Sequence, residues 1–222
     1  MTSTARRDRS PATRRTAALL VAAGAFAVIL SGCSPDRVGS AAVIDGRTVS
    51  SDDLQANARA YLAVVADGDA GDAQRAILQR MIVSAAIDEA ARKAGVRVPD
   101  GRVAAERDQL LESVGGPKAL IRTLAESQQP TVLAPQDIDR WVKDRLLFRG
   151  IAEGIAGGTL DPEGAETQQA LDETNTLLRE ASQRVDVEVS PRYGTWDPDT
   201  GLAPLLSGGL SQTAAELDDN GS

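Results

Sequence analysis

Residues 72–95, DAQRAILQRMIVSAAIDEAARKAG, decide the fold of this chain. Apolar side chains recur every three or four residues, which is the period of an α-helix, and Gly95 ends the pattern. The apolar stripe is too wide for a helix that packs against a single neighbour. We therefore expect a helix, capped at Asp72, in the middle of a helical core. The stripe comprises Ile77, Leu78, Met81, Ile82, Ala85 and Ala86.

Similar patterns on both sides predict further helices. They lie at 51–65, 100–114, 117–124, 134–153 and 161–181, and each begins with a capping residue or a proline. Asp161-Pro162 pairs an N-cap residue with a proline at the first helical position. Glycines at 154, 157 and 158 predict a flexible break before that last helix.

Two short segments predict strands. Residues 41–50 hold two apolar runs around Asp45-Gly46, a dipeptide typical of hairpin turns. Residues 185–190, VDVEVS, alternate strictly between apolar and polar. The fold class is therefore mainly α, about six helices over 41–200, clasped by these short N- and C-terminal strands as the only strands. Residues 33–40 predict a tether and 201–222 a disordered tail, since both are small and polar.

The N-terminus predicts export. Five arginines within residues 1–15 precede an apolar run at 17–30. A basic segment, an apolar segment and small residues before a cut are typical of a secretory signal peptide, here 1–32. The run is shorter than the roughly 20 residues that span a bilayer, which disfavours a permanent membrane helix. Residues 13–16 are similar to a twin-arginine export signal. That pattern usually has bulky apolar residues at the positions of Ala17 and Ala18, so the general secretory route is favoured.

Residues 30–33, LSGC, resemble the lipobox of bacterial lipoproteins. The resemblance implies that the Cys33 sulfur carries a diacylglycerol and palmitate-type acyl chains, with cleavage between Gly32 and Cys33. Two or three acyl chains give stable anchoring, whereas one does not. We therefore expect an extracytoplasmic protein, lipid-anchored to the bacterial cell membrane. The alternative is an ordinary signal peptide followed by a chance cysteine.

The composition argues against whole classes of function. The chain of 222 residues has no histidine and one cysteine, which removes His-dependent catalysis and Cys-rich metal sites. Loss of 1–32 takes the net charge from −8 to −12, and aromatic residues make up 3%, so nucleic acid is not an expected partner. Residues 197–201 lack the later oxygen ligands of a calcium loop, and an acidic turn is favoured. We expect no enzyme activity, cofactor or metal.

Four aromatic residues have two interpretations. Trp141 and Phe148 lie seven apart on one expected helix, and Tyr193 and Trp196 lie in the closing turn. They either line a groove for apolar peptide segments or serve packing, with Trp141 in the core and Trp196 over the end of the bundle. We favour packing, and the sequence assigns no client-binding residue.

The order of motifs resembles SurA-type periplasmic chaperones. The opening residues 43–54, the pair Gly115-Gly116, residues 137–147 and the closing segment 187–194 carry the resemblance, which covers 41–200. It implies a SurA N-terminal-like helical domain that cradles unfolded polypeptide. Many members add a parvulin domain, which catalyses prolyl isomerisation, but residues 154–163 hold only a glycine-rich link at the place of such an insertion.

The leading hypothesis is therefore a lipoprotein with chaperone-like binding of unfolded exported polypeptides and no chemical step. One alternative is a dedicated scaffold or adaptor lipoprotein that binds one folded envelope partner. A peptidyl-prolyl isomerase is the weaker alternative, because the parvulin domain and its histidines are missing. The oligomeric state is not predicted.

The first prediction concerns the anchor. Replacement Cys33→Ser removes the sulfur that the lipid requires, so the variant should incorporate no labelled palmitate and should remain at precursor size. The control Ser34→Ala keeps Cys33 and should be labelled like the wild type. The measurement is labelling in a bacterial host followed by electrophoresis, and equal labelling of the Cys33 variant would contradict the lipidation hypothesis.

Overall fold

The computed structural model describes residues 39–162 and 164–203. The predicted signal peptide, Gly32, Cys33, most of the tether and residues 204–222 of the predicted tail lie outside these ranges. Within them, none of the helices has the length and apolar character needed to cross a membrane.

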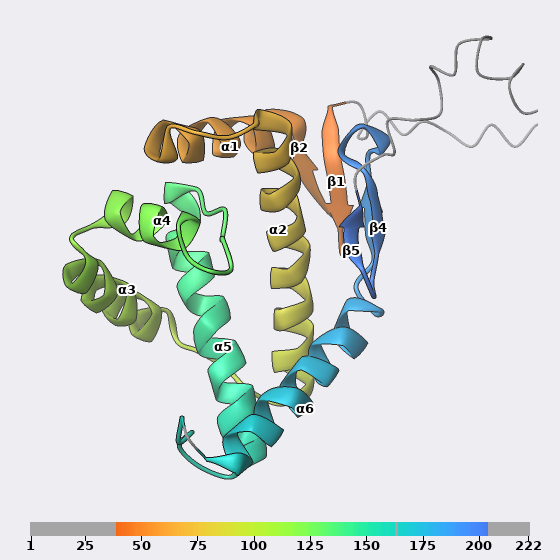
Figure 1. The fold of residues 1–222 in the computed structure, drawn as a ribbon. Coiled ribbons are helices and arrows are strands. Elements are labelled where there is room, and N and C mark those ends of the chain that lie inside the picture. Colours follow the sequence, from red (N-terminus) through yellow and green to blue (C-terminus); the bar gives the residue numbers. More distant parts are fainter. Residues whose placement is uncertain (1–38, 163, 204–222) are drawn as a thin grey trace, which may run out of the picture. The chain divides into compact units, whose positions relative to one another are not determined.

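Helix α2 (Ala70–Lys93) stands in the middle of the described elements, as Figure 1 shows. Its residues Ile77, Leu78 and Ile82 are fully buried, as expected for a helix that packs on several sides. The cap is Asp69 rather than Asp72, because the Asp69 carboxylate accepts a hydrogen bond of 2.9 Å from the backbone N–H of Asp72.

The described part of the chain holds five α-helices besides α2, so the prediction of a mainly helical domain is confirmed. Helices α1 (Ser51–Val65), α5 (Ile138–Ala156) and α6 (Ala165–Ser182) pack directly against α2. Helix α3 (Asp100–Val114) packs on α5, and α4 (Pro117–Ala125) packs on α1.

Helix α6 begins later than predicted. Its N-cap is Gly164, whose backbone N–H donates to the carbonyl of Asp161 at 2.9 Å. Asp161 and Pro162 therefore lie in the turn before the helix and do not start it. Gly154 remains inside α5, which ends at Gly157, where a φ of +71° suits a residue without a Cβ.

A three-stranded antiparallel sheet joins the two ends of the domain. Strand β1 (Ser40–Ile44) lies between β2 (Arg47–Ser50) and β3 (Val187–Val189). Asp45 and Gly46 connect β1 to β2 with φ values of +48° and +74°, as a type I′ hairpin turn requires. The strands at the two ends pair as predicted.

A second hairpin corrects the prediction that these are the only strands. Strand β4 (Thr195–Asp197) pairs with β5 (Gly201–Ala203), so the predicted tail begins after 203 at the earliest. The Asp197 carboxylate accepts hydrogen bonds from the backbone of Asp199 and Thr200, which closes the turn. The Gln79 side chain accepts from the backbone N–H of Leu202 at 2.5 Å and fastens β5 to α2.

Gly194 permits the close approach of this hairpin, with a φ of +125°. A Cβ at Gly194 would lie 2.2 Å from the carbonyl oxygen of Ala203. We predict that Gly194→Ala lowers the free energy of unfolding by about 1–3 kcal/mol through backbone strain and raises hydrogen exchange in β4 and β5.

Gly101 in α3 offers the matched control, because a Cβ there meets no atom within 4 Å. Gly101→Ala should be neutral or stabilise by up to about 1 kcal/mol through helix propensity. Urea denaturation and amide exchange measure both variants. Equal stability of the two variants would contradict the role assigned to Gly194.

Candidate functional site

Two cavities lie against α2 and share Arg80 and Ser84 in their linings. The polar pocket, of about 470 Å³, lies between α2, the β1–β2 hairpin and the start of α5. The apolar pocket, of about 440 Å³, lies between α2, α5 and α6. The polar pocket is lined by Ile44, Asp45, Arg47, Val49, Arg80, Met81, Ser84, Ala85, Asp88, Glu89, Arg92, Asp137 and Arg140.

Helical spacing places the charged residues of this region in two facing rows. Arg80, Ser84 and Asp88 follow one another at intervals of four and therefore share one face of α2. Arg140 and Asp144 are likewise four apart on α5. Since α2 packs against α5, these two rows meet between the helices.

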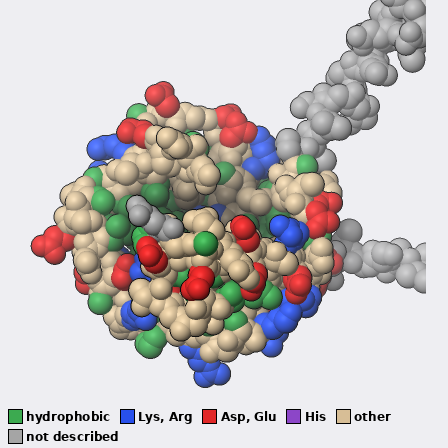
Figure 2. Space-filling model, turned by 60° about the horizontal axis from the view of Figure 1, so that its bottom comes forward, with side chains coloured by type: hydrophobic (Ala, Val, Ile, Leu, Met, Phe, Trp, Pro, Cys, Tyr) green, Lys and Arg blue, Asp and Glu red, His purple; other side chains and the backbone are tan. Residues whose placement is uncertain are grey.

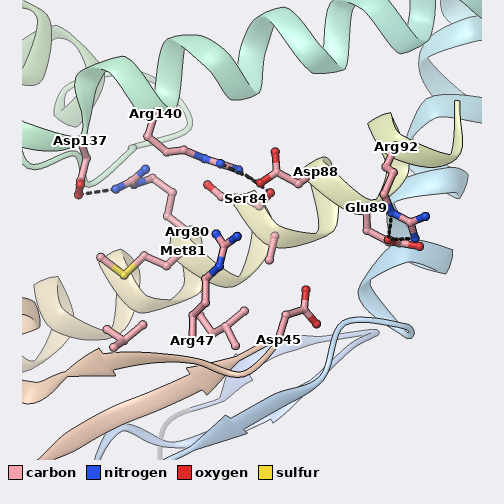
Figure 3. A pocket seen from close by; sticks show the side chains of 13 residues that line it. Asp45, Arg47, Arg80, Met81, Ser84, Asp88, Glu89, Arg92, Asp137 and Arg140 are labelled. Atoms are coloured by element: carbon pink, nitrogen blue, oxygen red, sulfur yellow. Dashed lines mark hydrogen bonds and ion pairs between the residues drawn. The ribbon is translucent and has the colours of Figure 1, made fainter. Parts of the chain in front are cut away.

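Crossed ion pairs join the two rows. Arg80 Nη2 lies 2.6 Å from Asp137 Oδ2, just before α5, and only 13% and 17% of these side chains are exposed. Arg140 Nη1 lies 2.8 Å from Asp88 Oδ2, and Arg140 Nε lies 2.9 Å from Asp144 Oδ1. Figure 3 shows Arg80 directed at Asp137 and Arg140 directed at Asp88.

Ser84 links the network to the backbone of α2. Its hydroxyl donates a hydrogen bond to Asp144 Oδ2, and its carbonyl accepts one of 2.7 Å from Arg140 Nη2. Arg140 of α5 therefore has three partners: Asp88 and the Ser84 carbonyl on α2, and Asp144 on its own helix. The network holds α5 in one register along α2, because any slip would leave buried charges without partners.

Burial shifts the titration of these groups. It raises the pKa of Asp137 and of Asp144, although Arg80 opposes the shift at Asp137 and both Ser84 and Arg140 oppose it at Asp144. Burial also lowers the pKa of Arg80, which Asp137 and Asp144 oppose. The carboxylates are therefore held in an environment that disfavours their charge, despite the arginines beside them.

Two arginines retain unused hydrogen-bond donors. Nε and Nη1 of Arg80 are buried and have no hydrogen-bond partner among the described residues. The side chain of Arg47, an exposed residue of β2, forms no hydrogen bond or ion pair with any residue that the structure describes. In Figure 3, Arg47 extends from the hairpin toward α2.

The apolar pocket has a different character. Trp141 and Phe148 of α5 are both half-buried and line it, with the Arg145 guanidinium 4.7 Å from the centre of the Trp141 ring. In Figure 2 the surface is hollowed, and green hydrophobic side chains line the hollow. The pocket is lined by Arg80, Val83, Ser84, Ile87, Thr131, Trp141, Asp144, Arg145, Phe148, Arg149, Leu160 and Leu171.

The aromatic residues only partly follow the packing interpretation. Trp196 and Trp141 both pack against the core, but Trp141 also forms a wall of the apolar pocket. Tyr193 is buried. The prediction of Trp141 as a plain core residue is therefore corrected, because α6 and residue 160 leave a cavity beside its ring.

The sequence did not identify the charged residues of the site. The signal was present as Arg80, Ser84 and Asp88, a polar row at helical spacing inside an otherwise apolar helix. Among the described residues, no group of three or more carboxylates, cysteines or histidines could hold a metal ion. The donors and apolar walls of the two pockets suit the binding of an amphipathic ligand.

Comparison with known proteins identifies no relative: no family model, no curated protein and no solved structure matches this chain. The resemblance to SurA-type chaperones therefore remains a prediction from the motifs of the sequence. The geometry of the two pockets has to support any functional proposal.

The buried carboxylate predicts a pH dependence of stability. Between pH 3.8, the ordinary pKa of aspartate, and its raised native pKa, Asp144 binds more protons in the folded than in the unfolded state. The contribution of Asp144 to the free energy of unfolding should therefore be largest below pH 3.8 and fall as the pH rises through this window. Asp144→Asn should remove this contribution.

The measurement is urea denaturation at a series of pH values, expressed as the difference between wild type and variant. Asp172→Asn, at an exposed position of α6, is the matched control and should give a difference that does not follow this trend. A wild-type advantage over Asp144→Asn that grows with rising pH would contradict the prediction.

Proposed function

We propose that this chain is an extracytoplasmic lipoprotein, anchored through Cys33, that binds extended segments of unfolded exported polypeptides without a chemical step. The observation that carries the proposal is the apolar pocket of about 440 Å³, walled by half-buried Trp141 and Phe148. The resemblance to SurA-type chaperones and the export-type N-terminus support the same function.

The pocket suits polypeptide side chains in size and chemistry. Its lining combines two aromatic rings of α5 with aliphatic residues of α2, α6 and the loop between α5 and α6, so an apolar side chain gains contact on several sides. Such burial stabilises a bound leucine or phenylalanine by about 1.5–3 kcal/mol when it is complete. One pocket of this size therefore supports weak and reversible binding, which a protein that must release its clients requires.

Guanidinium groups around the pocket add backbone recognition. Arg80, Arg145 and Arg149 line it, and Asp144 is the one carboxylate among the described residues of the lining. Arginine N–H groups donate to peptide carbonyls, and a backbone carbonyl is present in every client regardless of its sequence. A pocket that combines apolar walls with arginine N–H donors can therefore bind polypeptides of many different sequences.

The two tryptophans of the chain permit a direct test. Trp196→Phe leaves Trp141 as the single tryptophan, located in the wall of the apolar pocket. The full chain, reconstituted in lipid nanodiscs, is titrated with a tryptophan-free Gly/Ser peptide that carries a Leu-Leu pair. We expect a saturable blue shift of Trp141 emission, because a bound leucine excludes water from the indole ring.

Trp141→Phe is the matched control. It leaves Trp196, which packs against the core and lines neither pocket, and its emission should not respond. A Ser-Ser peptide should give no shift with either variant. If the Leu-Leu peptide also leaves Trp141 unchanged, binding of extended apolar segments is wrong, and the adaptor for one folded partner becomes the better hypothesis.

A further inference from the structure

We infer that the polar pocket is a carboxylate subsite for the same bound polypeptide. In this inference, Arg47 and Arg80 hold an acidic side chain that neighbours the apolar side chain in the apolar pocket. The inference rests on the proposed function and adds a preference for client segments in which a glutamate or aspartate lies next to an apolar residue.

The carboxylates that line the polar pocket already have partners. Asp137 pairs with Arg80, Asp88 pairs with Arg140, and Glu89 accepts from Arg92 Nη2. The Asp45 carboxylate accepts a hydrogen bond of 3.0 Å from the backbone N–H of Asp186, the residue just before β3. Each of these carboxylates therefore accepts at least one hydrogen bond from within the protein.

The donors of the same pocket are in excess. Arg80 uses one terminal nitrogen on Asp137, while its buried Nε and Nη1 have no partner among the described residues. Arg47 contributes a complete guanidinium group that is unused within the part of the chain described. These Arg80 atoms have almost no accessible surface, so a carboxylate that is first bound by exposed Arg47 reaches them when the Arg80 side chain shifts toward it. That contact removes the penalty of buried N–H donors without acceptors.

A carboxylate is the acceptor that fits these donors. Its two oxygens offer about four lone-pair sites and accept bidentate hydrogen bonds from guanidinium groups. The aliphatic walls of Ile44, Val49 and Met81 suit the methylene stem of an acidic side chain. The chain as a whole is acidic, so attraction for an anionic group has to come from these two arginines.

The position of Arg80 links the two subsites. Arg80 and Ser84 belong to the linings of both pockets, so a carboxylate on Arg80 lies at the border of the apolar pocket. In an extended peptide, neighbouring residues advance by about 3.3 Å and project to opposite sides. A leucine with a glutamate one or two residues away is therefore the segment that we expect to bind.

The test uses the full chain in nanodiscs of uncharged lipid and four fluorescent Gly/Ser peptides with amidated C-termini. Three carry Leu-Leu-Glu, Leu-Leu-Gln or Leu-Leu-Lys, and the fourth places the glutamate far from the leucines. We expect the Leu-Leu-Glu peptide to bind about tenfold more tightly than the Leu-Leu-Gln peptide, because a hydrogen bond to a charged group is stronger. The separated glutamate should give no gain.

Arg47→Gln tests the assignment without endangering the fold, since the Arg47 side chain is exposed and has no partner among the described residues. It should reduce the preference for glutamate to about threefold or less and leave the Leu-Leu-Gln affinity unchanged. Arg80→Gln should reduce the preference as well. Arg102→Gln, at an exposed position of α3 outside both pockets, is the control and should keep it.

The outcomes separate this inference from the proposed function. Equal binding of the glutamate and glutamine peptides overturns the carboxylate subsite but agrees with the proposed binding of polypeptide in the apolar pocket. A glutamate preference that survives in both Arg47→Gln and Arg80→Gln overturns the assignment to the polar pocket. If no peptide binds, both the proposed function and the subsite are wrong.

Discussion

The crossed ion pairs between α2 and α5 are the constraint on which the remaining structure depends. Arg80 with Asp137, and Arg140 with Asp88 and Asp144, place two positive and three negative groups between the helices. A buried charge without a partner costs several kcal/mol, so the two helices have one low-energy register. That register sets where α5 starts beside the hairpin and where it meets α6, and both cavities follow from it.

The aliphatic core surrounds this network and gives it rigidity. α2 carries its fully buried residues, among them Ile77 and Ile82, beside the polar row, so that one helix supplies both the core and the walls of the two pockets. The β1–β3 pairing connects the ends of the domain across α2. A pocket with rigid walls needs less ordering upon binding, which favours even a weak ligand.

The hairpin β4–β5 and the wall position of Trp141 show the limits of periodicity. Three-residue strands carry too little pattern to be recognised, and Gln79, 123 residues from Leu202 in the chain, fastens the hairpin to α2. The position of Trp141 on the inner face of its helix was predictable from spacing. Its exposure to a cavity was not, because the cavity depends on where α6 and residue 160 lie.

The sequence by itself determined the helices, their order, the central place of residues 72–95 and the two strand segments that pair, because amphipathic periodicity and turn residues act locally. The polar row of Arg80, Ser84 and Asp88 was present in the sequence, but periodicity alone did not identify it as a site. Only the tertiary structure decided which charges meet across α2 and α5, and that Arg47 and part of Arg80 keep unused donors. The physical reason is that periodicity defines which face of a helix is buried, whereas the partner opposite that face is set by how the helices pack.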